Sequence, residues 1–299
     1  MKIAVSGSTG LIGSPLVAAL TGRGHEVVRL MRRPMATAEP ALQWDPERGT
    51  IDRAGLERER ADAVIHLAGE NVFGRWTEAK KQRIRDSRVQ GTRLLGETLA
   101  GLERRPATLL AASAIGYYGD RGAEALTEQS GSGDDFLAEV ARAWEAATAP
   151  AGRAGIRVVN MRFGIVLTTK GGALGKMLPP FWLGLGGPIG SSNQSVSWIE
   201  LGDAINAILH LLDRQDLAGP VNITAPTPVT NREMATTLGK VLHRPSIVPV
   251  PSFALRIAFG TEGAEMLQSG QRVLPERLLA SGFQFRYPVL EPALRALLA

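Results

Sequence analysis

Three glycines near the N-terminus constrain the fold more than any other feature of this 299-residue sequence. Gly7, Gly10 and Gly13 form the spacing G-x-x-G-x-x-G between a short apolar segment, residues 2–6, and a predicted helix, residues 11–20. In a strand–turn–helix unit these glycines allow a tight turn, close approach of the backbone to a pyrophosphate, and close packing of the helix on the sheet. The alternative is a tight turn that binds no ligand.

Apolar segments and helical segments alternate regularly beyond this turn. The apolar segments are predicted strands because they are short, rich in Val, Ile and Leu, and followed by glycine or polar residues. Near-continuous apolar strands are typical of a parallel sheet that is buried on both faces. The alternation therefore predicts an α/β protein with a Rossmann fold, a doubly wound parallel sheet. The predicted strands span residues 2–6, 26–31, 62–67, 108–112 and 156–161, and the predicted helices span residues 11–20, 78–103 and 134–149.

The second half of the chain differs from the first in composition. Glycine and proline crowd residues 171–190, which predicts a loop with little regular structure. We expect residues 1–165 to form a dinucleotide-binding domain, completed by parts of residues 195–225. Residues 166–299 should form a smaller α/β substrate-binding lobe that includes a C-terminal module at about 248–297. The lobe's predicted elements are helices at 201–212, 231–242 and 291–298 and a strand at 221–224, with Thr230 and Glu233 as a capping box.

Charge and composition argue against several classes of partner. The net charge is +5, and no basic run is long enough for a nucleic-acid-binding tail. The chain has no cysteine, and its four histidines show no ligand spacing, so we expect no metal. No apolar run reaches the ~20 residues of a membrane span, and the N-terminus does not read as a signal peptide. We expect a cytoplasmic protein that binds neither nucleic acid nor membrane; a homodimer is left open.

The end of the second predicted strand distinguishes between two cofactors. Proteins that bind NAD usually carry an acidic residue about 20 residues after the glycines, to hold the ribose 2′-hydroxyl. Here the strand ends in Arg32 and Arg33, and the next acidic residue is Glu39. Guanidinium groups bind phosphate well, so the pair favours the 2′-phosphate of NADP(H). The alternative is a pair of exposed surface arginines.

Several motifs in sequence order resemble one superfamily. SGSTGLIG at 6–13, DAVIHLAG at 62–69 and SAIGYYG at 113–119 resemble the extended short-chain dehydrogenase/reductases, which include nucleotide-sugar epimerases and dehydratases. Residues 69–95, 195–205 and 272–288 narrow the resemblance to the atypical "epimerase family", YfcH-like group. The resemblance covers nearly the whole chain. It implies an NAD-dependent epimerase/dehydratase-like domain that binds NADP, followed by a C-terminal domain of unknown function.

We expect residues at and near the ends of several strands to bind the cofactor. Glu70 is either a candidate acid–base group beside the cofactor or a solvated surface residue. Arg88 lies on the apolar stripe of the helix at 78–103, so it either reaches the cofactor cleft or an anionic substrate, or snorkels to the surface. The expected cofactor-binding residues are Gly7, Thr9, Gly10, Leu11, Ile12, Gly13, Arg32, Arg33, Leu67, Ala68, Gly69, Glu70, Arg88 and Ser113.

The sequence departs from the superfamily at its proton relay. That chemistry uses a Tyr-x-x-x-Lys pair on the helix after the SAIGYYG strand, preceded by a Ser or Thr at the strand end. If Glu145 matches the glutamate that usually follows the pair, the two positions are Leu137 and Ala141; a shift of one makes them Phe136 and Val140. None of these side chains can carry a proton. The serine position falls on Ala114, or on Ser113 after a slip of one.

Two catalytic candidates and a set of substrate-binding candidates remain. Ser113 and Tyr117 are the catalytic candidates, and the alternative for Tyr117 is a rim aromatic that packs on cofactor or substrate. Trp198 is either a pocket residue or a core residue. The substrate candidates are Trp76, Tyr117, Asn193, Gln194 and Trp198. Two functions follow: an NADP(H)-dependent oxidoreductase or epimerase-like enzyme acting on a small polar, sugar- or nucleotide-like molecule, or a non-catalytic NADP(H)-binding sensor or regulatory protein.

Overall fold

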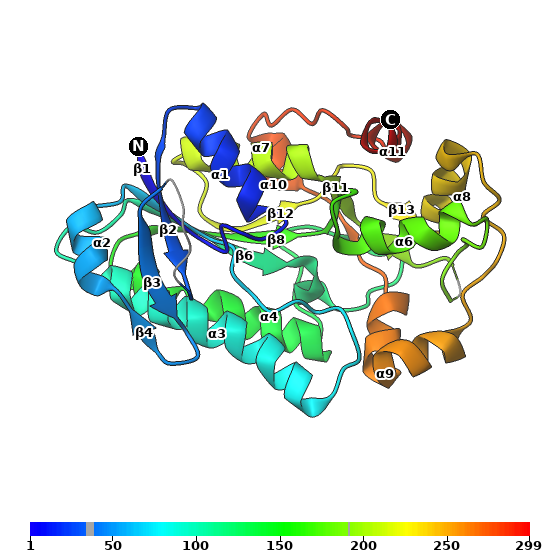
Figure 1. Ribbon diagram of the computed structural model, residues 1–299, viewed down its shortest axis with the longest axis horizontal. Coiled ribbons are helices and arrows are strands. Elements are labelled where there is room, and N and C mark those ends of the chain that lie inside the picture. The colour runs from blue at the N-terminus through cyan, green and yellow to red at the C-terminus, as the bar shows by residue number, and fades with distance from the viewer. Residues whose placement is uncertain (34–38, 191) are drawn as a thin grey trace.

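A twisted, mostly parallel sheet forms the centre of the computed structural model, which describes residues 1–33, 39–190 and 192–299 (Figure 1). Its strands are β1 (Lys2–Ser6), β2 (Glu26–Met31), β3 (Ala41–Asp45), β4 (Thr50–Ile51), β5 (Ala63–His66), β6 (Thr108–Ala114), β8 (Arg157–Phe163) and β12 (Gly219–Ile223). Their spatial order is β12-β8-β6-β5-β1-β2-β3-β4. Neighbouring strands pair in parallel except for β3 and β4, which form a hairpin at the edge. The predicted doubly wound Rossmann fold is confirmed.

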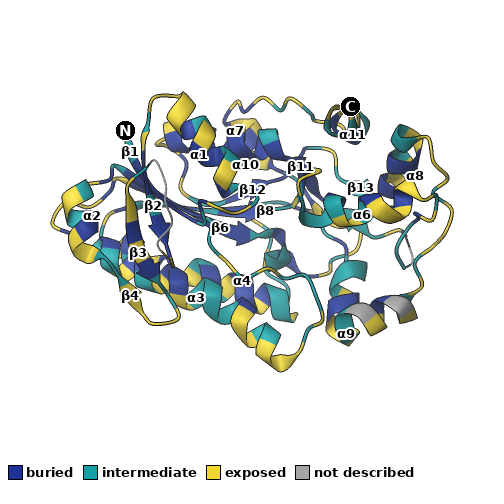
Figure 2. Ribbon diagram, in the orientation of Figure 1, coloured by how far each residue is buried: buried dark blue, intermediate teal, exposed yellow. Residues whose placement is uncertain are grey.

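Helices cover both faces of the sheet because each turns one apolar stripe inward. On one face, Leu16 and Leu20 of α1 pack with Ile208 of α7 in one buried cluster. On the other face, Leu95 and Leu99 of α3 pack in a second cluster that also contains Leu56 of α2. Figure 2 shows the buried sheet between these two layers. The helices of this half are α1 (Gly13–Gly22), α2 (Arg53–Glu59), α3 (Glu78–Ala100), α4 (Phe136–Ala146), α5 (Ala149–Arg153) and α7 (Leu201–Asp213), with the short 3-10 helix η1 (Ile115–Tyr118).

The strand order reverses direction beside β1. The chain winds outward from β1 through β2 and β3, and then returns to place β5 on the other side of β1. At such a switch point, loops from the carboxyl ends of the two neighbouring strands diverge and leave a crevice, where ligands bind in open α/β sheets. The fold therefore places the glycine turn after β1 next to the Leu67–Gly69 turn after β5.

The C-terminal lobe has its own apolar core at the right of Figure 1. Leu174 and Phe181 of α6, Leu238 of α8 and Leu294 of α11 meet there around Trp198. The predicted capping box at Thr230 and Glu233 is present at the start of α8. The lobe contains α6 (Gly172–Trp182), α8 (Asn231–Leu242), α9 (Ser252–Gln268) and α11 (Leu290–Leu298), whereas α10 (Glu276–Ala280) packs against the sheet through Leu278. Short strand pairs join it: β7 (Ala125–Leu126) with β14 (Arg272–Val273), β9 (Ile165–Leu167) with β11 (Trp198–Glu200), and β10 (Ser195–Val196) with β13 (Val229–Thr230).

The prediction of a loop over residues 171–190 was wrong for its first half, which forms α6. The glycines lie near the start of this helix, and Pro179 and Pro180 lie in its last turns, where each removes one backbone N–H donor. Burial of Leu174, Leu178 and Phe181 against the lobe's core outweighs the poor helix propensity of the segment.

The C-terminal segment is tied to the sheet half by buried hydrogen bonds. The Asp203 carboxylate on α7 accepts from the backbone N–H groups of Arg286 and Tyr287 at 2.9 and 2.8 Å. The Ser197 hydroxyl pairs with the backbone of Gln271 and Val273. None of the helices in the described residues is long and apolar enough to cross a membrane.

Candidate functional site

The glycine turn leaves no room for side chains. Gly7 has φ +69°, a left-handed conformation that favours glycine, and a Cβ there would lie 2.8 Å from the backbone of Ala68. A Cβ on Gly13 would lie 2.0 Å from the Gly7 carbonyl oxygen. Arg29 supports the turn from β2, because its guanidinium donates to the Ser8 carbonyl at 3.3 Å. Helix α1 therefore begins directly against the turn, with its first backbone N–H groups facing the crevice.

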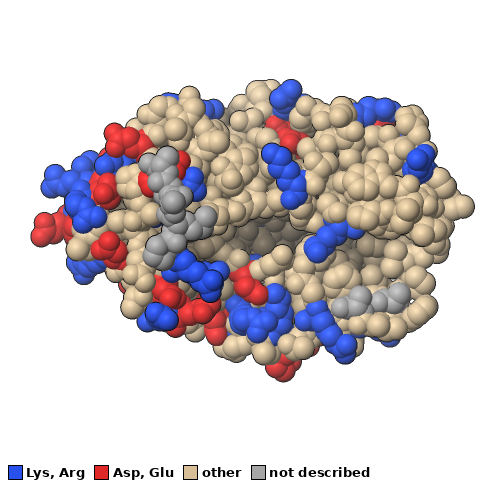
Figure 3. Space-filling model, viewed as in Figure 1, with Lys and Arg blue, Asp and Glu red and all other residues tan. Residues whose placement is uncertain are grey.

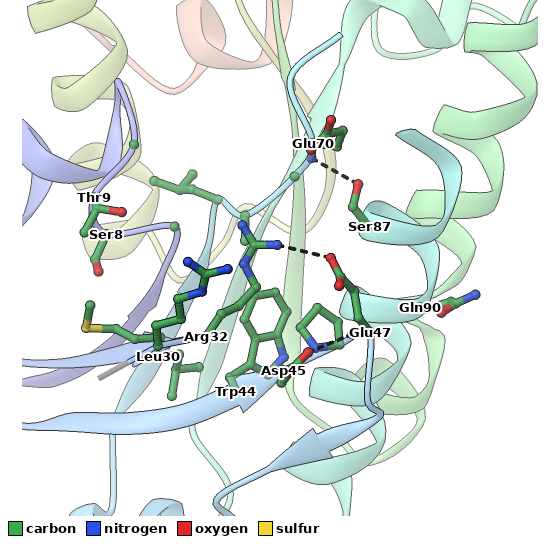
Figure 4. Close-up of a pocket in the computed structure, with 18 of the residues that line it drawn as sticks. Ser8, Thr9, Leu30, Arg32, Trp44, Asp45, Glu47, Glu70, Ser87 and Gln90 are labelled. Carbon is green, nitrogen blue, oxygen red and sulfur yellow. Dashed lines mark hydrogen bonds and ion pairs between the residues drawn. The ribbon is translucent and has the colours of Figure 1, made fainter. Parts of the chain in front are cut away.

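A cavity of about 1160 Å³ lies in front of this turn, and we call it the glycine cavity (Figure 4). Figure 4 shows Ser8 and Thr9 on one side and Ser87 of α3 on the other. Of the residues predicted to bind cofactor, those that line the cavity are Gly7, Thr9, Gly10, Arg32, Arg33, Leu67, Ala68, Gly69 and Glu70. In Figure 3, a hollow crosses the middle of the molecule, with Lys and Arg at its border.

The two arginines after β2 are both exposed in this cavity. Arg32 makes an ion pair with Glu47 at 3.3 Å, and the two side chains keep 62% and 79% of their accessible surface. An ion pair that is this exposed contributes little stability, so an incoming phosphate can compete for the guanidinium. The position and exposure of Arg32 and Arg33 suit a phosphate group bound at the carboxyl end of β2.

Leu11, Ile12 and Gly13 take part in the turn without lining the glycine cavity. Leu11 faces Gly171 and Gly172, whose added Cβ atoms would lie 3.4 and 3.1 Å from it, and Ile12 packs against the sheet's core cluster. Leu11, Ile12 and Gly13 support the turn, and their role in cofactor binding stays a prediction.

Glu70 is held as an ionised carboxylate. Lys80 donates to it at 2.7 Å and lowers its pKa. Its backbone N–H donates to the Ser87 hydroxyl at 3.0 Å, which fixes the loop after β5 against α3. A carboxyl group with a lowered pKa is a poor proton donor, so this geometry argues against an acid role for Glu70.

A second cavity of about 1060 Å³ lies between the sheet half and the C-terminal lobe, and we call it the aromatic cavity. Its aromatic lining residues are Phe73, Trp76, Phe136, Trp144, Phe163, Phe181 and Phe259. Phe136, Leu137, Val140 and Ala141 all line it. Both registers considered for the Tyr-x-x-x-Lys pair therefore point into this cavity, and in neither register can the side chain carry a proton.

Ser113 faces away from both cavities. It is 3% exposed, and its hydroxyl donates to Glu145 at 2.7 Å. Glu145 also receives two hydrogen bonds from the guanidinium of Arg162, at 2.7 and 2.8 Å. Ala114, the next residue, is the one that lines the aromatic cavity. This arrangement counts against direct proton transfer or cofactor contact by the Ser113 hydroxyl.

Tyr117 is half-buried and packs against the same group of side chains. Its ring packs on the Arg162 guanidinium, 3.5 Å from the Arg162 Cζ to the ring centroid. Arg162 also donates to the Tyr118 hydroxyl at 3.0 Å. Burial opposes the charged form of Arg162, but the ion pair with Glu145 raises its pKa overall. Tyr117 is in the lining of neither the glycine cavity nor the aromatic cavity, although its neighbour Gly116 lines the aromatic cavity.

Arg88 reaches the interior rather than the surface. Its Nη1 donates to the carbonyls of Glu70 and Ile84 at 3.0 and 3.1 Å, and its Cζ lies 4.9 Å from the centroid of the Trp144 ring. Burial lowers its pKa to about 10, so the group is a cation at neutral pH. A Cβ on Gly69 would lie 3.5 Å from the guanidinium. Arg88 thus lines the aromatic cavity at the point nearest the glycine cavity.

The predicted substrate residues divide into two groups. Trp76 and Gln194 line the aromatic cavity. Asn193 is exposed outside both cavities. The pocket role of Trp198 was wrong: the side chain is fully buried in the lobe's core, and its Nε1 donates to the Thr227 carbonyl at 3.1 Å. It lies on β11 between α6 and α8, where a large apolar side chain fills the space between packed layers.

The histidines form no metal site in the described part of the chain, where no group of three or more His, Cys, Asp or Glu side chains is placed to hold an ion. His66 is a fully buried core residue. It bonds Ser6 at 2.6 Å and Thr92 at 3.0 Å, and burial lowers its pKa to about 4.

Comparison with known proteins identifies the family. Residues 3–224 match the NAD dependent epimerase/dehydratase family, and residues 250–297 match a domain of unknown function (DUF1731). The chain belongs to the NAD dependent epimerase/dehydratase family. It is 43% identical over 293 residues to the "Epimerase family protein MT2273" of Mycobacterium tuberculosis, covering 98% of this chain and 96% of that protein.

Two solved structures extend this comparison. The crystal structure of human epimerase family protein SDR39U1 (isoform2) with NADPH matches with a TM-score of 0.90 and 36% identity, over 99% of both chains. The nucleoside-diphosphate sugar epimerase from Corynebacterium glutamicum matches with a TM-score of 0.79 and 38% identity, over 98% of this chain and 57% of that one.

The residues that form one wall of the glycine cavity were not predicted from the sequence. Gln43, Trp44, Asp45 and Pro46 line it because the β3–β4 hairpin lies next to β2 at the sheet edge. The signal was available: residues 41–45 alternate between exposed and buried side chains, and the D-P-E-R-G segment that follows is a turn sequence.

Proposed function

We propose that this protein binds NADP(H) across the switch point of the sheet and exchanges a hydride between the cofactor and a small molecule in the aromatic cavity. The observation that carries the proposal is that the two cavities come close together at Gly69 and Arg88. Gly69 lines the glycine cavity, and the Arg88 guanidinium beside it lines the aromatic cavity. A dinucleotide with its pyrophosphate at the glycine turn extends from the first cavity toward the second.

The residues of the glycine cavity fit the adenosine half of the cofactor. The glycine turn and the start of α1 offer backbone N–H groups to the pyrophosphate. Arg32 and Arg33 suit the 2′-phosphate, and Leu67–Gly69 offer backbone beside the ribose and nicotinamide. The human relative's structure holds NADPH, which supports the choice of the phosphorylated cofactor.

The aromatic cavity fits a substrate with an apolar body. The Corynebacterium relative's description as a nucleoside-diphosphate sugar epimerase supports a sugar- or nucleotide-like substrate. The lining of this cavity, however, is mainly apolar, and much of it is aromatic and aliphatic. A bare sugar would leave many hydroxyls without partners in such a space.

A second candidate function is NADP(H) binding without turnover. One observation favours it: Leu137, Ala141, Phe136 and Val140 occupy the lining where the superfamily places its proton relay. A sensor or regulatory protein needs the cofactor to shift its stability or shape, and needs no proton donor.

A thermal-shift titration with NADPH, NADP⁺, NADH and NAD⁺ tests the cofactor site. A ligand that binds only the native state at a hundredfold excess over its Kd stabilises it by about 2.7 kcal/mol. We expect NADPH to raise the Tm more than NADH, and Arg32→Ala/Arg33→Ala to abolish that difference. Arg58→Ala on α2, which lines neither cavity, is the control and should leave the difference intact. Absence of any shift at millimolar dinucleotide would refute the proposal.

A further inference from the structure

The strand-end wall of the aromatic cavity offers no acid. Where β6, β8 and α4 enclose the cavity, the lining residues are Ala114, Ile115, Leu137, Val140, Ala141 and Phe163. Five carboxylates lie elsewhere in the lining: Asp120, Asp135, Glu139, Glu262 and Glu265. Asp120 accepts from the backbone N–H groups of Gly122 and Gly270 at 3.1 and 3.3 Å, and Glu265 lies on α9, in the C-terminal lobe. Asp135 caps α4, Glu139 pairs with Arg85 at its rim, and Glu262 pairs with Lys81. A molecule reduced against this wall therefore cannot take a proton from it in the same step.

Lack of an acid restricts which acceptors can be reduced. A hydride added to a simple ketone or sugar carbonyl leaves an alkoxide, whose conjugate acid is about as weak an acid as water. A hydride added to a quinone leaves a phenolate-type anion, whose conjugate acid has a pKa of about 10, as a tyrosine phenol does. The second anion survives without a donor if a positive charge lies beside it, and water protonates it later.

Arg88 supplies such a charge. It makes no ion pair with a carboxylate in the described part of the chain, and its Nε and Nη2 make no hydrogen bond to a described residue. A half-buried guanidinium with unused donors is costly unless a ligand meets it. Its position between Gly69 and Trp144 is where the cofactor's reactive end would meet an acceptor. Its fixed contacts to the carbonyls of Glu70 and Ile84 hold it there before any ligand binds.

The walls of the cavity suit a flat conjugated ring. Trp76 and Phe136 stand edge to face with centroids 5.5 Å apart, and Trp144 lies under the Arg88 guanidinium. Aromatic surfaces arranged in this way offer offset and edge contacts to a bicyclic ring system. The polar lining residues, among them Gln194, Ser195 and Asn231, lie on other segments of the lining.

We propose that the acceptor of this protein is a quinone-type conjugated carbonyl compound, and that Arg88 stabilises the oxyanion formed on it. The proposal rests on the proposed function and names its substrate class. NADPH transfers a hydride, which carries two electrons and one proton, to the quinone and becomes NADP⁺. The quinone becomes the hydroquinone monoanion, and one proton from water completes the hydroquinone. Arg88 holds the oxyanion through its free N–H donors and releases it neutral, without giving up a proton of its own.

The test compares two bicyclic probes on the full chain: menadione, a quinone, and α-tetralone, a simple ketone of similar shape. Binding is read first, without NADPH, from quenching of the fluorescence of Trp76 and Trp144. The chain has no cysteine, so quenching by menadione does not come from a thiol adduct. Oxidation of NADPH is then followed with each probe, with the rate in the absence of protein subtracted.

We expect menadione-dependent oxidation of NADPH and at least ~100-fold less with α-tetralone. In Arg88→Met, kcat for menadione should fall ~100-fold, the cost of removing one charge-stabilising group, while KM and quenching change less than threefold. Arg88→Lys keeps the charge and should recover part of kcat. NADPH-induced stabilisation of each variant checks that it is folded and loaded.

Each other outcome has a defined meaning. Equal reduction of α-tetralone would show that an acid is present, and it would overturn the proposal. NADPH binding without menadione quenching or turnover would also overturn it, and would leave the cofactor site standing. Turnover that is unaffected in Arg88→Met would overturn the role of Arg88. If NADPH itself does not bind, the proposed function fails first, and the substrate class fails with it.

Discussion

The glycine cavity and the aromatic cavity have similar volumes, about 1160 and 1060 Å³, but they are built in different ways. The key surface of the first is backbone from two short turns, supported by glycines that no larger residue can replace. The second is assembled from side chains of the sheet half, α4, α6 and α9. A site made of backbone leaves a local pattern in the sequence, whereas a site made of converging side chains leaves none until the chain folds.

The two cavities also differ in the charged side chains around them. The glycine cavity carries exposed arginines that are available to a phosphate. Behind the aromatic cavity, Arg162 and Glu145 form a buried pair, with side chains 3% and 13% exposed, joined to Ser113 and Tyr118. The two catalytic candidates from the sequence, Ser113 and Tyr117, contact this Arg162–Glu145 pair. The residues beside them that face the cavity are apolar.

The substitution with the largest expected effect tests whether Trp198 is a core residue. Trp198→Ala should destabilise the protein by about 4 kcal/mol in urea unfolding, because a fully buried indole leaves a large cavity in the lobe's core. Trp76→Ala, in the lining of the aromatic cavity, should cost much less and should weaken menadione quenching instead. A loss below about 1 kcal/mol for Trp198→Ala would contradict its core role.

The buried pair behind the aromatic cavity provides the next test. Glu145→Gln keeps the side-chain shape but leaves the Arg162 charge buried without its partner, which should cost at least about 3 kcal/mol of unfolding free energy. Glu139→Gln on the same helix breaks only an exposed pair with Arg85 and serves as the control, with no measurable loss expected. Equal stability of the two variants would mean that the Arg162–Glu145 pair is not structural.

The core under the glycine cavity should show its own pH dependence through His66. Burial lowers its pKa to about 4, against about 6.5 in the unfolded chain. Between these values the unfolded state binds a proton and the native state does not, so stability falls as the pH drops from 6.5 to 4. The loss should reach about 3 kcal/mol. Urea unfolding of wild type and His66→Gln across this window measures it, and parallel pH profiles would exclude His66 as the cause.

The substitution with the smallest expected effect tests whether NADPH binding depends on the backbone of the glycine turn. Gly13→Ala places a Cβ 2.0 Å from the Gly7 carbonyl oxygen, so the turn must shift, and NADPH binding should weaken at least ~100-fold, or ~2.7 kcal/mol. Gly22→Ala at the other end of α1 meets nothing within 4 Å and should bind NADPH as wild type does. Calorimetric titration of both variants with NADPH distinguishes them; equal affinities would remove the steric argument for the motif.

Much of the fold was predictable because local patterns agreed with the tertiary structure. The parallel sheet, the capping box at Thr230 and the core role of His66 follow from short-range periodicity and turn chemistry. The failures share one cause. In α6, tertiary burial overrides the glycine and proline content, and the β3–β4 hairpin gains its role only by lying beside β2.

The sequence alone determined the dinucleotide-type turn, the parallel sheet and the absence of the usual proton relay. Each depends on residues close together in the chain, where sterics and periodicity act directly. Only the tertiary structure decided that Ser113 and Tyr117 join a buried network around Arg162, that Trp198 fills a core, and that Arg88 faces a cavity. Those outcomes depend on which distant side chains meet, and a charge or an indole is buried or exposed according to its neighbours in space.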